Sequence, residues 1–190
     1  MKLLGYFFGG KIDYQNYLRA TETVLKQSQK RKQPYKVRVL GHEFVVGPGV
    51  FSTRYFRDTE IFAQMLPIKK GDHFLEIGCG IGAIGILGAL RGAKKVVLTD
   101  INTRACRACR RNVILHGLED RVEVRQGDLF SPLKKDERFS KIFWNVPFGY
   151  VARKRLTILG KAVFDYRYES VQKYLREAKA HLSLGGRIFI

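Results

Sequence analysis

The segment from Phe74 to Gly82, written FLEIGCGIG, constrains the fold of this chain more than any other stretch. It is an apolar run that ends in three glycines at alternate positions. Glycine adopts backbone conformations closed to other residues, so the pattern predicts a strand that turns sharply into a helix. A strand followed by a helix is the repeating unit of α/β proteins and predicts a parallel sheet.

Strand-like and helix-like segments alternate regularly after residue 73. Several of the strand-like segments are apolar on both faces, as in the run Val96, Val97, Leu98, which is typical of a sheet covered on both sides. The predicted fold class is therefore α/β. We expect strands at 73–77, 95–99, 122–126, 140–145 and 187–190, and helices at 83–91, 103–116 and 168–182.

The first part of the chain is organised differently. Residues 11–31 repeat apolar side chains at helical spacing, and Pro34 ends this predicted helix. Residues 36–46 are predicted to form a β-hairpin around Gly41 and His42. A further short helix is predicted to start at Asp58, which can cap it.

Positive charge is the most informative property of the composition. The 190 residues include 35 Lys and Arg against 17 Asp and Glu, a formal net charge of +18. Such an excess favours attraction to polyanions, nucleic acid first, although a solvated basic surface gives the same count. Residues 26–42 and 149–164 concentrate cations without any acid.

The expected location follows from two further properties of the sequence. No apolar run approaches the roughly 20 residues that a membrane span needs, and no cleavage site follows the short apolar patch near the start. Three cysteines cannot form a disulfide framework, which favours a reducing, cytoplasmic setting.

Two classes of ligand fit the glycine-rich turn. Residues 80–85 match the G-x-G-x-x-G pattern of dinucleotide-binding proteins, whose pyrophosphate lies at a helix N-terminus. The same glycines match E-x-G-x-G-x-G, and Glu76 then favours S-adenosylmethionine, because a carboxylate can bind the ammonium group of that cofactor. A structural turn without any ligand is the third alternative.

Two aspartates at later strand ends extend this candidate cofactor site. Asp100 lies 24 residues after Glu76, where a carboxylate can accept both ribose hydroxyls in either cofactor class or cap the next helix. Asp128 follows the third strand and can accept a hydrogen bond from an adenine amino group, or be an ordinary loop acid. The candidate cofactor-binding residues are Glu76, Gly78, Gly80, Gly82, Asp100 and Asp128.

The segment from Asn145 to Phe148, Asn-Val-Pro-Phe, ends the fourth predicted strand. Ligands of open α/β sheets bind at the carboxyl ends of strands, so this turn and the glycine loop should face one crevice. The Asn145 side-chain oxygen and the Val146 carbonyl can each accept a hydrogen bond from one NH2 group, and Phe148 can stack on its planar system. Positioning would then do much of the work of methyl transfer to nitrogen. A structural turn with a core Phe is the alternative.

Together these motifs resemble the class I S-adenosylmethionine-dependent methyltransferases of the small-domain group. That group includes release-factor glutamine methyltransferases and ribosomal-RNA guanine-N2 methyltransferases. The resemblance implies a Rossmann-like class I methyltransferase sheet with helices on both faces, lacking the family's C-terminal strands. It implies a catalytic domain over residues 44–190, behind a basic helix and the start of a hairpin in residues 1–43. The resemblance rests on the glycine loop and the strand end before it (Glu76 to Gly82), Asp100, Gly127 to Phe130, Asn145 to Phe148 and Leu184 to Gly186.

One departure from the family's N-P-P-[FY] motif concerns catalysis. Val146 replaces the first proline, which keeps the carbonyl but loses the fixed φ angle, at a cost of about 0.4–1 kcal/mol in rigidity. The 40-odd residues at the front are too short for the helical domain with which the glutamine enzymes bind release factors. With the basic charge, this length favours RNA as the substrate.

The predicted function is methylation of a planar amino group, a nucleobase in RNA or a ribonucleoprotein, with S-adenosylmethionine as cofactor. The predicted catalytic residues are Asn145, Val146, Pro147 and Phe148. A protein glutamine is the alternative acceptor. A non-catalytic RNA-binding or scaffold protein and a nicotinamide-dependent oxidoreductase are alternatives of other classes.

No metal site is predicted. Cys106 and Cys109 form a C-x-x-C within a predicted helix, where they share one face and are expected to pack in the core. The four histidines show no metal-ligand spacing. The oligomeric state is not predicted.

Overall fold

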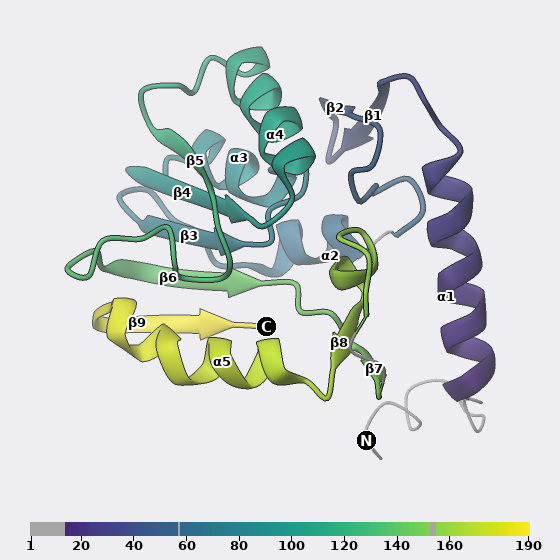
Figure 1. The fold of residues 1–190 in the computed structure, drawn as a ribbon. Coiled ribbons are helices and arrows are strands. Elements are labelled where there is room, and N and C mark those ends of the chain that lie inside the picture. Colours follow the sequence, from purple (N-terminus) through teal and green to yellow (C-terminus); the bar gives the residue numbers. More distant parts are fainter. Residues whose placement is uncertain (1–13, 57, 153–154) are drawn as a thin grey trace.

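A computed structural model of the chain describes residues 14–56, 58–152 and 155–190. Its centre is a five-stranded sheet in the order β5-β4-β3-β6-β9, with every neighbouring pair parallel. This order, with helices after β3 and β4 and before β9, is a Rossmann-like α/β fold, as predicted (Figure 1). The strands are β3 (His73–Ile77), β4 (Lys95–Asp100), β5 (Val122–Gln126), β6 (Phe139–Trp144) and β9 (Leu182–Phe189).

Helices cover both faces of the sheet (Figure 1). On one face, α3 (Ala83–Leu90) and α4 (Thr103–Leu115) pack on the sheet, and α2 (Asp58–Met65) packs into the same core. On the other face lies α5 (Glu169–Ala178), followed by the short helix η3 (Lys179–His181). Successive β3 side chains alternate between the two cores: Phe74 packs on the α3 side and Leu75 on the α5 side. The strand is therefore apolar on both faces, as a covered parallel strand should be.

The N-terminal part of the described chain packs against α4 and against the segment that follows β6. The hairpin β1 (Tyr35–Val39) and β2 (His42–Val46) is tied to α4 by Asn112, whose side chain bonds both the N–H and the carbonyl of Val45. Helix α1 (Tyr14–Gln29) contributes Leu25 to a small apolar cluster with Leu159 and Phe164. Leu159 and Phe164 belong to the segment that follows β6, so this cluster joins α1 to that segment.

The segment between β6 and α5 holds two very short strands. These are β7 (Gly149–Val151) and β8 (Phe164–Tyr166), which pair in parallel, with the short helix η2 (Gly160–Ala162) before β8. The sequence analysis missed all three, because three-residue strands are too short to show an alternating pattern.

Several boundaries predicted from the sequence were wrong. The helix predicted at 168–182 ends at Ala178, because η3 and then β9 follow it. Strand β9 begins at Leu182 and not at 187, because a bulge between its pairings with Phe139 and Lys141 interrupts the apolar pattern. The hairpin turns at Leu40 and Gly41, which have φ angles of 48° and 81°, and His42 already belongs to β2. Residues 11–13 of the predicted first helix lie outside the described residues. None of the helices in the described part of the chain combines the length and apolar character of a membrane span.

A candidate cofactor and target site at the strand ends

A cavity of about 310 Å³ lies at the carboxyl ends of β3, β4 and β6. This volume is at the lower end of the range for small-molecule sites. The ends of β3 and β6 both line it, so Glu76 and Asn145 border one crevice, the arrangement that the sequence predicted. Of the predicted site residues, the lining contains Glu76, Gly78, Gly80, Asp100, Asp128, Asn145 and Pro147. It does not contain Gly82, Val146 or Phe148.

Glu76 is buried at the end of β3, with 4% of its surface exposed. One of its oxygens accepts a hydrogen bond of 2.8 Å from the N–H of Gly85. Burial raises the pKa of this carboxyl to about 8, and the nearby charge of Asp100 adds to the rise, while the Gly85 bond opposes it. The side chain is therefore mostly protonated at neutral pH until a cation enters the cavity.

Asp100 at the end of β4 holds the glycine loop from the other side. Its two carboxylate oxygens accept hydrogen bonds from the N–H of Gly80, at 2.9 Å, and from the N–H of Asn102, at 2.8 Å. Burial raises the pKa of Asp100, against the lowering effect of these two bonds. The turn that carries the backbone toward the cavity is thus fixed by two acids from neighbouring strands.

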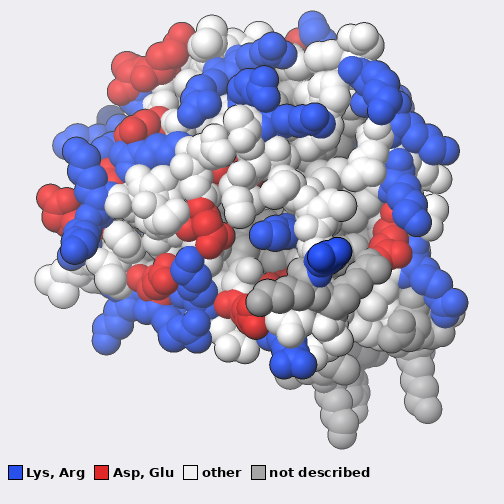
Figure 2. Space-filling model, in the orientation of Figure 1, with Lys and Arg blue, Asp and Glu red and all other residues white. Residues whose placement is uncertain are grey.

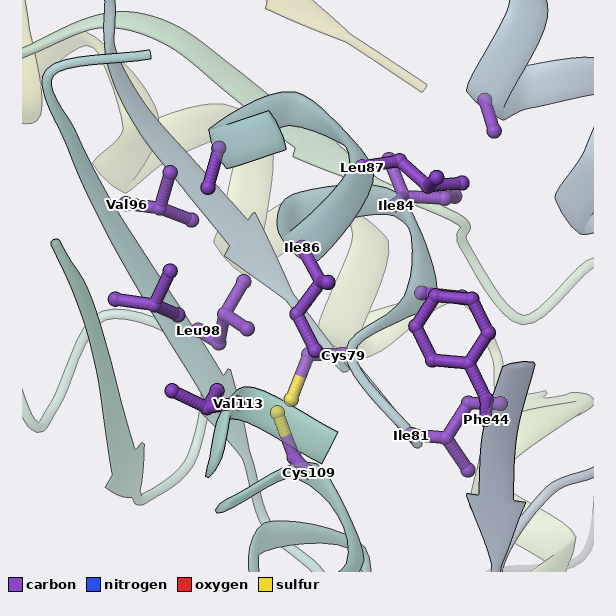
Figure 3. Close-up of a cluster of buried hydrophobic side chains, with 14 of the residues drawn as sticks. Phe44, Cys79, Ile81, Ile84, Ile86, Leu87, Val96, Leu98, Cys109 and Val113 are labelled. Atoms are coloured by element: carbon purple, nitrogen blue, oxygen red, sulfur yellow. The ribbon is translucent and has the colours of Figure 1, made fainter. Parts of the chain in front are cut away.

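Close packing requires glycine at the end of the loop and again in the first turn of α3. A Cβ atom on Gly82 would lie 2.5 Å from the Cys109 sulfur, and one on Gly85 would lie 2.2 Å from the Leu98 side chain. Figure 3 shows the sulfur atoms of Cys79 and Cys109 facing each other where the loop meets α4. A hydrogen bond to Cys109 and burial raise the pKa of Cys79 well above its ordinary value. Cys106 and Cys109 are fully buried, which confirms their predicted core packing.

Asn145 immediately follows β6, and its carboxamide is held by a side chain far away in the sequence. The Asn145 Nδ2 donates a 2.8 Å hydrogen bond to a carboxylate oxygen of Asp58. A carboxylate accepts and cannot donate, so the Nδ2 end must face Asp58. The Oδ1 end accepts no hydrogen bond from a described residue, and it can accept one from a ligand in the cavity. The other Asp58 oxygen accepts from the N–H of Thr59, at 3.0 Å, at the start of α2.

The rest of the Asn-Val-Pro-Phe segment divides between the cavity and its surroundings. Pro147 is buried and lines the cavity, and Val146 packs on the α5-side core. Phe148 is 39% exposed, and its ring centroid lies 5.9 Å from that of Tyr17 on α1. The predicted stacking of Phe148 on a target group stays a prediction.

Asp128 borders the cavity as an exposed loop residue. Its carboxylate forms an ion pair of 3.0 Å with Lys173 of α5, which raises the pKa of that lysine. An exposed pair of this kind contributes about 0–1 kcal/mol to stability, so Asp128 can exchange this partner for a ligand at low cost.

The cavity surroundings include residues that were not among the predicted site residues. Trp144 is buried and also borders the cavity, with its Nε1 3.0 Å from where a Cβ on Gly78 would lie. Asp58 was predicted only to cap a helix, and neighbouring Thr59 is buried in the cavity wall. The pairing of Asp58 with Asn145 spans 87 positions, and nothing in a single sequence signals it.

The residues of the crevice fit S-adenosylmethionine. A buried carboxyl at Glu76 suits the cofactor's ammonium, Asp100 suits hydroxyls, and Asp128 suits an adenine amino group. No group of three or more His, Cys, Asp or Glu side chains placed to hold a metal ion occurs among the described residues.

The chain is similar to known methyltransferases. Ribosomal protein L11 methyltransferase of Syntrophomonas wolfei is 26% identical over 176 residues, 86% of this chain and 56% of that protein. Ribosomal RNA small subunit methyltransferase C of Aeromonas hydrophila is 32% identical over 148 residues, 75% of this chain and 37% of that protein. The chain thus spans little more than half the length of such relatives, or less.

Among solved structures, a tRNA m1G37 methyltransferase of M. jannaschii has the same fold. The TM-score is 0.59 at 19% identity, covering 83% of this chain and 41% of that one. Residues 41–190 match the model of the methyltransferase small domain. This match favours S-adenosylmethionine over a dinucleotide as the ligand of the glycine loop. The chain belongs to the methyltransferase small domain family.

Proposed function

We propose that this protein is an S-adenosylmethionine-dependent N-methyltransferase whose target is a planar amino group of a nucleobase in RNA. The observation that carries the proposal is the position of Asn145. Its carboxamide borders the same crevice as Glu76 and Asp100, and its orientation is fixed by Asp58. The proposed catalytic domain covers residues 44–190, with the basic N-terminal part ahead of it.

The cofactor side of the crevice binds and orients. Glu76 holds the ammonium group, Asp100 holds the ribose hydroxyls and Asp128 holds the adenine amino group. Gly78 and Gly80 let the backbone approach the ligand closely, and Gly82 supports them by letting the loop pack against α4. When bound, S-adenosylmethionine supplies a methyl group already activated by its sulfonium sulfur.

The target side positions the nitrogen that receives the methyl group. Asn145 Oδ1 and the Val146 carbonyl accept hydrogen bonds from the two hydrogens of the target NH2 group. Holding both hydrogens off the plane localises the nitrogen lone pair and aims it at the methyl carbon. Pro147 shapes the wall of this subsite, and Phe148 stacks on the target. The nitrogen gains the methyl group and releases one proton to solvent. Alignment of this kind supplies much of the rate enhancement in such transfers.

RNA is favoured over protein as the substrate by charge. The net charge of +18 favours a polyanionic partner, and ribosomal RNA and tRNA appear in the names of similar proteins. The second candidate is a protein carboxamide such as a glutamine side chain, because an NH2 group of the same geometry fits Asn145. A similar protein named for a ribosomal protein supports keeping this candidate. We place the activity in the cytoplasm.

The test is to incubate the chain with methyl-labelled S-adenosylmethionine and separated pools of total RNA and total protein. We expect the label in RNA, followed by nucleoside analysis that identifies an N-methylated base. Label confined to protein would replace RNA by the second candidate. Cofactor binding in calorimetry without label in either pool would favour a non-catalytic RNA-binding or scaffold protein. No binding of S-adenosylmethionine would contradict the proposal outright.

A further inference from the structure

A second hollow adjoins the crevice and is lined by positive charge. This basic groove has a volume of about 1120 Å³ and lies between the end of α1, the turn at Gly47–Gly49 and the first half of α4. Its cations are Arg31, Lys32, Arg104, Arg107 and Arg111. No Asp or Glu is among the described residues that line it. Figure 2 shows Lys and Arg side chains gathered over the region of α4 and along α1.

Within the described part of the chain, the charges of the basic groove have no acidic partners. All five cationic residues are exposed, and none of them takes part in an ion pair between described residues. Arg104, Arg107 and Arg111 stand at helical spacing on one face of α4, where like charges repel one another and destabilise the helix. The positive end of the α4 dipole lies at the same place. A bound polyanion would relieve this repulsion.

The shape of the basic groove suits an extended ligand. Arg104 and Arg111 lie seven positions apart, about 10 Å along a helix axis, which corresponds to about three phosphates of a stacked strand. The groove is also fixed in place: the Asn102 Nδ2 donates a 2.9 Å hydrogen bond to the Gly49 carbonyl, which ties the turn to the start of α4. Guanidinium groups match phosphate oxygens two at a time.

The basic groove is continuous with the crevice. Ile101, Asn102, Ile158 and Leu159 line both hollows. A strand lying across α4 would therefore run to the rim of the cavity that holds Asn145. We propose that the basic groove is the docking site for the RNA strand that carries the target base. This inference rests on the proposed function, because it takes RNA as the substrate.

The test compares two triple variants that each remove three positive charges. One is Arg104→Gln, Arg107→Gln, Arg111→Gln in the groove. The control is Lys94→Gln, Lys134→Gln, Lys135→Gln, three exposed lysines outside the groove lining. Binding of a fluorescein-labelled single-stranded RNA is followed by anisotropy over a salt series, without cofactor. Calorimetry with S-adenosylmethionine shows that both variants keep the folded cofactor site.

We expect the groove variant to bind the RNA at least about tenfold more weakly. The plot of log affinity against log salt should become less steep, with the magnitude of its negative slope smaller by about 2, because three phosphate contacts are lost. The control should stay within about twofold of the unaltered chain. Equal losses in both variants would overturn the inference, and so would equal competition by poly-L-glutamate, which would assign the groove to an acidic protein.

The two proposals can fail separately. Groove-dependent RNA binding without methyl transfer to any RNA would uphold the docking site and contradict the proposed function. Methyl transfer to RNA that proceeds equally well in the groove variant at limiting RNA would uphold the function and overturn the docking site.

Discussion

The two sides of the crevice are held together in different ways. On the cofactor side, the N–H of Gly85 in α3 binds the buried carboxyl of Glu76, and the N–H of Gly80 in the glycine loop binds the half-buried carboxyl of Asp100. On the target side, side chains from distant elements hold the backbone: Tyr14 on α1 donates to the Tyr150 carbonyl, and Tyr168 donates to the Phe148 carbonyl, both at 3.0 Å. The cofactor side is therefore a local unit, whereas the target side depends on tertiary contacts.

This difference extends to exposure and strain. The end of the glycine loop and α3 are buried from Ile81 to Ala89, whereas Phe148 and Tyr150 are each 39% exposed. Arg167 and Tyr168, just before α5, have φ angles of 51° and 55°, a conformation that costs non-glycine residues about 1–3 kcal/mol. Such a conformation persists where surrounding contacts enforce it. Here it accompanies the hydrogen bond from the Tyr168 hydroxyl to the Phe148 carbonyl. The target side is thus the more exposed of the two and contains strained backbone, which is typical of binding segments carried on loops.

The largest expected effect on folding stability is on the cofactor side. Gly85→Ala places a methyl group 2.2 Å from Leu98 and 3.0 Å from the Glu76 carboxyl. We expect a loss of about 1–3 kcal/mol in the free energy of unfolding, measured by denaturant titration. The matched control is Gly47→Ala, whose new methyl group would find its nearest atoms at 3.8 and 3.9 Å. Equal stability of the two variants would show that the loop is not tightly packed.

The next effect separates the two sides through Asp58, a positioning residue. Asp58→Ala removes the acceptor that holds the Asn145 Nδ2, so we expect kcat to fall about 10-fold to 100-fold, from a charge-assisted bond of about 1.5–3 kcal/mol. The cofactor Kd should not change. Asp58→Asn keeps an oxygen that can accept from Asn145 and should recover most of the activity. A matching rise in the Kd of S-adenosylmethionine would assign Asp58 to the cofactor side.

A smaller effect concerns the proton on Glu76. The pKa of about 8 leaves this carboxyl protonated at pH 7, and an ammonium group beside it would lower that pKa and expel the proton. We expect release of up to about one proton per cofactor bound at pH 7, seen as a binding enthalpy that varies with the ionisation enthalpy of the buffer. Above pH 9 the carboxyl is already ionised, so the release should vanish. Buffer-independent enthalpies at pH 7, or the same release in Glu76→Gln, would place the ammonium elsewhere.

The smallest expected effect tests the support that α1 gives to the target side. Tyr17→Ala removes the ring that lies against Phe148, a contact of about 0.5–1.5 kcal/mol. The KM for RNA should rise about 2-fold to 10-fold with the cofactor Kd unchanged, while Tyr17→Phe keeps the ring and should behave as the unaltered chain. A KM that does not move in Tyr17→Ala would remove α1 from substrate binding.

The same contrast explains how much the sequence predicted. Strands β3 and β5 and the start of α3 were predicted to the residue, because their patterns are local and uninterrupted. Glu76, Gly80 and Asp100 were predicted as cavity residues for the same reason, since a strand end and its turn are contiguous in the chain. The parallel order of the strands follows from their alternation with helices.

The target side was less predictable. The place of Asn145 at the crevice followed from the rule for strand ends, but its partner Asp58 comes from a helix 87 positions earlier. Strands β7 and β8 have three residues each in a basic segment without alternation. The exposure of Phe148 depends on packing by α1. Contacts between distant elements decide all three features, and a single sequence carries no record of them.

The most direct test of the whole account is the variant Asn145→Ala, with two constants measured on the same preparation. If one side of the crevice binds the cofactor and the other positions the target, the Kd for S-adenosylmethionine stays within about twofold. The rate of methyl transfer to RNA then falls by at least about a hundredfold, because the target nitrogen is no longer positioned for the transfer step. Transfer at the unaltered rate, or a loss of cofactor binding that accounts for the lost activity, would contradict it.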